Sequence, residues 1–167
     1  FKQPVRQWAE VVADSHFGGK SESYRQAWQM MAENVLVTYS DTRGTLTNLR
    51  PYLIKPSIWT GNSEYFYNNI TLYQIWGKML EEVSDTDMYA FDVVNVARQV
   101  MGNLFIDLRR EFVRAASVKD HKSMHHARCA MMELLDDMDA LLSTQDEFSL
   151  SRWIAYARAW GEIDGRA

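Results

Sequence analysis

Residues 87–116, DMYAFDVVNVARQVMGNLFIDLRREFVRAA, form the longest helical pattern in this 167-residue chain. At a rise of about 1.5 Å per residue they predict a helix of about 45 Å. The apolar side chains recur at spacings of three and four, which places them on one helix face: Val93, Val94, Ala97, Val100, Met101, Leu104, Phe105, Leu108 and Phe112. This segment is therefore expected to be the main helix of the fold.

Shorter helical patterns precede and follow this segment. They cover residues 4–17, 23–39, about 68–83, 120–142 and 149–160. A capping box at residues 23–26 starts the second, and the last is expected to turn Leu150, Trp153, Ile154, Ala157 and Trp160 inward. All three prolines lie in the first third of the chain, and glycines are few after residue 57, unlike strand-and-turn proteins. The prediction is an all-α fold of about six helices in an antiparallel array.

One long irregular loop, at about 40–62, interrupts these patterns. It contains Pro51, Pro56 and Gly61, yet it keeps many apolar residues. A loop of this length inside a compact domain is usually functional or packed against a partner. Residues 40–67 are therefore expected to form a contact surface.

Composition indicates one globular domain over residues 1–167, because 47% of the residues are apolar and 24% are charged. The net charge of −4 argues against a nucleic-acid partner. No apolar run approaches the roughly 20 residues of a membrane span. Phe1 stands where an initiator Met is usual, so the chain is expected to come from a longer protein.

The search for chemistry predicts no catalytic residue, metal site or cofactor. His121 and His125 have metal-ligand spacing, but no third ligand is visible. A single cysteine, Cys129, builds neither a disulfide nor a zinc site. Four acidic residues near the end of the fifth helical pattern are interpreted as an acidic face that serves solubility or meets a basic partner surface: Glu133, Asp136, Asp137 and Asp139. No nucleotide-binding or hydrolase motif occurs.

A polar strip interrupts the apolar pattern of residues 87–116. Asp92, Asn95 and Gln99 lie at i, i+3 and i+7, with Arg98 beside them. A buried Asp92 carboxylate would need a donor such as Arg50 or backbone amides of the irregular loop. The alternative is direct contact with a ligand, and the structural interpretation is favoured.

Several short motifs follow one another along the chain: Ala27-Trp28, Arg43-Gly44, Arg50-Pro51, Pro56-Ser57-Ile58-Trp59, Trp76 with Leu80, Asp92-Val93-Val94, Arg98-Gln99, Leu134-Leu135 and Trp153-Ile154. In this order and spacing they resemble the start of the all-helical C-terminal domain of the alpha-N-acetylglucosaminidases, a family of glycoside hydrolases. The resemblance covers nearly the whole chain. In that family the signature of the long helix has a second acid and a threonine, where this chain has Asn95 and Ala97.

The resemblance implies an accessory domain that packs on an upstream catalytic barrel of the same polypeptide and helps to wall its sugar cleft. In the family the barrel carries both catalytic carboxylates, so no residue here inherits their roles. It also implies a terminal N-acetylglucosamine glycan as substrate of the parent enzyme, and a periplasmic, secreted or lysosomal location. The candidates for the substrate cleft or the interdomain contact are Arg43, Thr45, Arg50, Trp59, Tyr65, Asp92, Arg98 and Gln99.

Two other interpretations stay open on the sequence. One is a stand-alone helical module whose aromatic loop binds a protein or a glycan. The other is a small helical cofactor-binding protein.

Overall fold

The computed structural model describes residues 4–36 and 67–163, and these residues are helical with no strand among them. The predicted all-α fold is confirmed. The irregular loop at 40–62 lies outside the described residues. The helices are α1 (Val5–Phe17), α2 (Glu22–Asn34), α3 (Asn69–Met79), α4 (Asp87–Ser117), α5 (His121–Leu142) and α6 (Leu150–Ile163), with a short 3-10 helix η2 (Asp146–Phe148) before α6.

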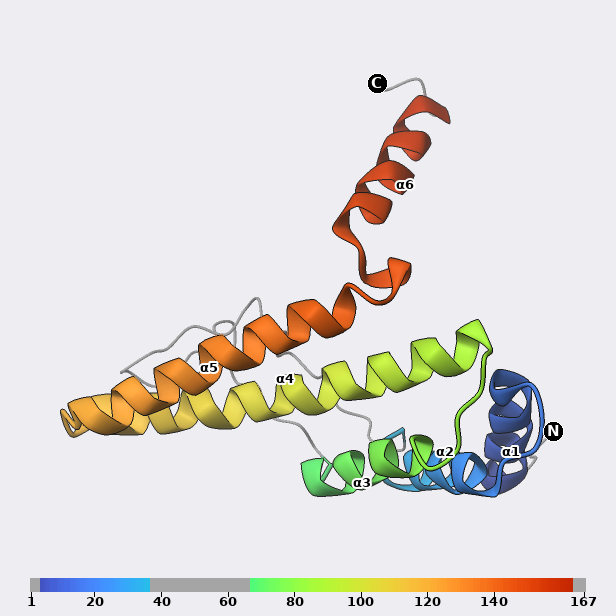
Figure 1. Ribbon diagram of the computed structural model, residues 1–167, viewed down its shortest axis with the longest axis horizontal. Helices are drawn as coiled ribbons and strands as arrows, with labels where there is room; N and C mark the ends of the chain where they lie inside the picture. Colours follow the sequence, from blue (N-terminus) through green and yellow to red (C-terminus); the bar gives the residue numbers. More distant parts are fainter. Residues whose placement is uncertain (1–3, 37–66, 164–167) are drawn as a thin grey trace.

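The array is built along α4. Its C-terminal half packs against α5 in a long antiparallel hairpin, and its N-terminal half lies over α1, α2 and α3 (Figure 1). Helix α1 packs on α2, and α2 packs on α3. Helix α6 contacts η2 and points away from the hairpin (Figure 1).

Two helix ends differ from the prediction. Ser21, not Ser23, caps α2, because its Oγ accepts from the Tyr24 N–H at 3.1 Å, whereas the Ser23 hydroxyl donates to Glu82. Helix α2 ends at Asn34, short of residue 39, because the N–H of Leu36 bonds back to the carbonyl of Met31, which closes the last turn.

Helix α3 is also shorter than predicted. It ends at Met79, and the Leu80 N–H bonds to carbonyls of the last turn. Val83, which the pattern placed on this helix, lies beyond its end and is 79% exposed. The apolar spacing of three and four therefore continued past the end of the helix.

The main core lies where α1, α2, α3 and α4 meet. Phe17, Tyr24 and Tyr89 contact one another there with ring centroids 5.4 to 5.6 Å apart, a favourable aromatic geometry. The Tyr89 hydroxyl donates to the carbonyl of Met79 at 3.0 Å. A smaller core between α4 and α5 contains Phe105, Ile106 and Leu134. The buried residues of the main core are Ala13, Tyr24, Ala27, Met31, Leu72, Ile75, Met79, Tyr89 and Val96.

The inward orientation expected for the α6 side chains is wrong. Leu150, Trp153 and Trp160 are 73%, 64% and 75% exposed, and Ile154 and Ala157 are exposed as well. The apolar side chains do share one helix face, but no described element covers it: Trp153 lines an open hollow with Phe91 of α4 and Phe148 of η2 and stays largely exposed. Periodicity shows which residues share a face and not what covers it.

Replacing Gly18 with Ala should destabilise the protein. Gly18 ends α1 with φ +75°, and an added Cβ would lie 2.7 Å from the Thr86 methyl carbon. Left-handed backbone costs a residue with a side chain about 1–2 kcal/mol, and the clash adds to this cost. We expect thermal unfolding to show a melting temperature lower by at least about 3 °C. Gly19→Ala, where a Cβ meets nothing within 4 Å, is the control. Equal effects of the two substitutions would contradict this explanation.

The ion pair between α1 and α2 should make stability depend on pH. Arg25 donates to both oxygens of Asp14, at 2.6 and 2.5 Å, and this lowers the pKa of Asp14 below its usual value of 3.8. A carboxylate whose pKa is lowered in the folded state stabilises that state at pH values above its usual pKa. This stabilisation is lost as the pH falls through the lowered pKa. Asp14→Asn should therefore lower the melting temperature near about pH 7 and have a much smaller effect near about pH 2. If the difference in melting temperature between Asp14→Asn and the unchanged chain were the same at both pH values, this explanation would be contradicted.

Candidate functional site

A buried carboxylate joins three helices at the N-terminal half of α4. Asp92 is 7% exposed, and its Oδ2 accepts a hydrogen bond from the Tyr24 hydroxyl at 2.7 Å. The same oxygen lies 2.6 Å from Nδ1 of His16. Tyr24 belongs to α2 and His16 to α1, so one carboxylate oxygen ties both helices to α4. We call Asp92, His16 and Tyr24 the polar junction.

The surroundings hold each member of the polar junction in place. Burial, with the Asp92 carboxylate adding to it, raises the pKa of Tyr24, so its hydroxyl stays a donor. The His16 ring packs edge-on against Trp28, with centroids 5.4 Å apart. The His16 carbonyl accepts from the Thr86 hydroxyl at the start of α4. These contacts leave the carboxylate little freedom to turn toward solvent.

The structure shows two partners of Asp92 that the sequence analysis did not name. Arg50 and the irregular loop, the expected donors, lie outside the described residues. Tyr24 and His16 are 68 and 76 residues away from Asp92 along the chain. Sequence reasoning considered a cation or backbone amides and missed a tyrosine hydroxyl and an imidazole. The available signal was that both residues sit on the first two helical patterns, beside their apolar faces.

The other residues of the polar strip belong to two hydrogen-bond networks that do not include Asp92. Gln99 donates to Asn103 at 3.1 Å, and Asn103, only 1% exposed, donates to the Tyr67 hydroxyl and to Asn69 at the start of α3. Arg98 donates to the Asn95 amide oxygen at 2.8 and 3.2 Å. Asn103 was missed, although it continues the strip four residues after Gln99.

The structure locates three of the eight candidate residues for the cleft or the interdomain contact. Asp92, Arg98 and Gln99 all lie on α4, but each belongs to a different set of hydrogen bonds. The Arg98 guanidinium also lies 5.8 Å from the ring centre of Phe148 in η2. The other five candidates lie outside the described residues: Arg43, Thr45, Arg50, Trp59 and Tyr65.

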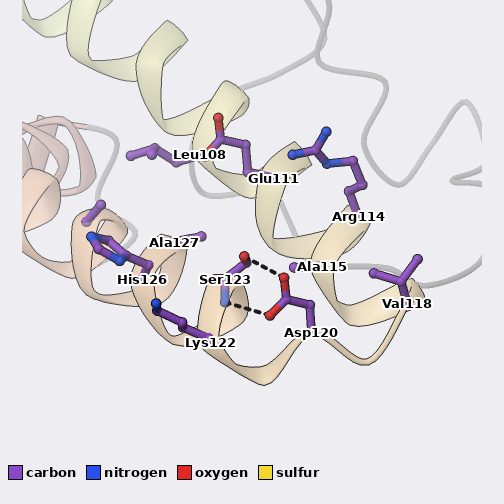
Figure 2. A pocket seen from close by; sticks show the side chains of 11 residues that line it. Leu108, Glu111, Arg114, Ala115, Val118, Asp120, Lys122, Ser123, His126 and Ala127 are labelled. Atoms are coloured by element: carbon purple, nitrogen blue, oxygen red, sulfur yellow. Dashed lines mark hydrogen bonds between the residues drawn. The ribbon is translucent and has the colours of Figure 1, made fainter.

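An open hollow of about 690 Å³ lies at the turn between α4 and α5 (Figure 2). Its charges are mixed, because Glu111 and Asp120 line it together with Arg114 and Lys122. Asp120 already accepts hydrogen bonds within the protein. It caps α5 by accepting from the backbone N–H and the hydroxyl of Ser123, and these bonds lower the pKa of Asp120. The hollow therefore presents no preorganised set of groups for one ligand charge.

Among the described residues, the histidine pair on α5 belongs to no set of metal ligands. His121 and His125 are exposed, and across residues 4–36 and 67–163 no three His, Cys, Asp or Glu side chains gather closely enough to hold a metal ion. In the same ranges, no helix is both long enough and apolar enough to cross a bilayer.

The fold and the polar junction define an all-helical domain organised along one long helix. Residues 8–166 match the family described as "Alpha-N-acetylglucosaminidase (NAGLU) C-terminal domain", and the chain belongs to this family. It is also 25% identical over 158 residues to the human protein Alpha-N-acetylglucosaminidase. That alignment covers 91% of this chain and 21% of the human protein, so the chain spans about a fifth of the relative's length.

Removing the Asp92 carboxylate should strongly destabilise the fold. Asp92→Ala leaves the buried Tyr24 hydroxyl and the partly buried His16 imidazole without their acceptor, and a buried donor left unsatisfied costs about 1–3 kcal/mol. Urea unfolding should show a free energy of unfolding that is lower by this amount. Asp107→Ala on the same helix, where the side chain is 43% exposed and pairs with Arg110, is the control and should shift the midpoint little. A similarly small shift for Asp92→Ala would show that the junction does not hold the helices together.

Proposed function

We propose that this chain is the accessory C-terminal helical domain of an alpha-N-acetylglucosaminidase-like glycoside hydrolase. In this proposal it packs on an upstream catalytic barrel of the same polypeptide and helps to wall the sugar cleft. The family match over residues 8–166 supports the proposal, as does the human relative being about five times as long as the matched region. A terminal N-acetylglucosamine glycan is the proposed substrate of the whole enzyme.

The observation that carries the proposal is that the Asp92 carboxylate is buried and already hydrogen-bonded within the domain. Retaining glycosidases need two carboxyl groups about 5–5.5 Å apart, facing the sugar, as acid and nucleophile. Asp92 instead is buried and accepts hydrogen bonds from two other helices. The acidic side chains near the end of α5 face solvent. These carboxylates support a scaffold role, with the chemistry carried elsewhere in the polypeptide.

We infer the cleft side of the domain from the remaining candidates. Arg98 and Gln99 lie on α4 and are only partly buried. In the proposal they face the barrel together with the loop residues Arg43, Thr45, Arg50, Trp59 and Tyr65. The family resemblance implies a histidine in some members where this chain has Thr45, so in this proposal the contact with sugar through this loop differs from theirs.

The alternative is a stand-alone helical module that binds a protein or a glycan. The exposed apolar side chains of α6 would suit such a module. The gene separates the two proposals, because the accessory role requires a barrel encoded directly upstream of Phe1. A gene that encodes no barrel would favour the module.

The isolated chain should not hydrolyse an aryl alpha-N-acetylglucosaminide, whereas its complete gene product should. The measurement is release of the aryl alcohol, with buffer as the blank and matched molar amounts of the two proteins. Activity of the isolated chain that survives repurification, and that is lost when one acidic residue of this chain is replaced, would contradict the proposal.

A further inference from the structure

We propose that Asn103 is a positioning residue of the sugar cleft. It acts by holding the Gln99 side chain so that the Gln99 carbonyl oxygen accepts a hydrogen bond from a hydroxyl of the sugar. The inference rests on the proposed function, because it takes the cleft of the parent enzyme to include Gln99. It adds the atom of Gln99 that meets the substrate and the residue that orients this atom.

Asn103 is a buried amide whose hydrogen bonds reach three segments of the chain. The residue is 1% exposed. Its Nδ2 donates to the Tyr67 hydroxyl oxygen at 3.1 Å and to Oδ1 of Asn69, at the start of α3, at 2.9 Å. Its Oδ1 accepts from Nε2 of Gln99 at 3.1 Å. Both polar atoms of the amide therefore have partners, and a buried network that is satisfied in this way is held in one arrangement.

The orientation of Asn103 decides which end of the Gln99 amide faces it. Both N–H groups of Asn103 donate to acceptors, so the carbonyl oxygen is the atom that faces Gln99. This oxygen can only accept, and Gln99 therefore turns its Nε2 toward Asn103. The atom of Gln99 turned away from Asn103 is the carbonyl oxygen Oε1, and no described residue donates to it.

The network runs from the interior of the domain to its surface. Gln99 and Asn103 are four residues apart on α4 and so are neighbours on one helix face. Asn103 is fully buried, whereas Gln99 is only partly buried. Tyr67 belongs to the same network, and Tyr65, another proposed cleft residue, precedes it by two residues in the sequence. A sugar hydroxyl is a hydrogen-bond donor, which is the chemistry that the Gln99 carbonyl oxygen accepts.

Steady-state kinetics of the complete gene product on an aryl alpha-N-acetylglucosaminide test this inference. Gln99→Leu removes the acceptor, and Asn103→Leu removes the bond that orients it. We expect each variant to raise KM about fivefold with little change in kcat, because one hydrogen bond between uncharged groups is lost from substrate and transition state alike. A merely structural effect would lower the amount of active enzyme, and hence the apparent kcat, and would leave KM unchanged.

Three further variants separate positioning from general disturbance. The double variant Gln99→Leu/Asn103→Leu should have the KM of Gln99→Leu alone, because Asn103 acts through Gln99. Asn103→Asp keeps an acceptor for the Gln99 N–H and should hold KM within about twofold of that of the unchanged enzyme. Asn34→Leu, at an exposed asparagine of α2 that donates to the Met30 carbonyl, is the matched control and should leave KM and kcat unchanged. If Asn103→Leu does not fold, the comparison of Gln99→Leu with Asn103→Asp decides the outcome.

Three results would overturn the inference while activity of the unchanged enzyme upheld the proposed function. They are an unchanged KM in Gln99→Leu, a KM raised by Asn103→Asp as much as by Gln99→Leu, and effects on KM that multiply in the double variant. A complete gene product with no activity on this substrate would overturn the proposed function, and the inference with it.

Discussion

The fold depends on one desolvated carboxylate. Burying a charge is costly unless donors surround it, and Asp92 finds its donors on two other helices, Tyr24 on α2 and His16 on α1. The end of α1 is fixed to the same region, because Ser84 donates to the Phe17 carbonyl at 2.6 Å just before α4 begins. Apolar packing alone would tolerate sliding of these helices, whereas the junction sets their register.

The sequence predicted what depends on local spacing. It predicted the helices, their approximate limits and the unusual carboxylate on the long helix, because these follow from periodicity and from the cost of burying charge. It did not predict which residues pair with Asp92, since His16 is 76 residues away and only tertiary packing brings it close. It also failed for α6, because the spacing places its apolar side chains on one face but does not determine whether that face is buried.

The two ends of the described structure differ in how tightly they are packed. The half of α4 near Asp92 is fixed to α1, α2 and α3 by buried polar contacts and a shared core. Helix α6, by contrast, contacts the array through η2 and exposes its largest side chains. In the accessory-domain proposal, the first region is the scaffold.

The most direct test of the central claim, that Asp92 organises the helices through its hydrogen bonds, is a double-mutant cycle. Unfolding free energies are measured in urea for Asp92→Asn, Tyr24→Phe, the double variant and the unchanged chain. The account predicts a coupling energy of about 1 kcal/mol or more between the two positions. Additive effects, within about 0.3 kcal/mol, would show that the carboxylate and the hydroxyl act independently and would contradict the account.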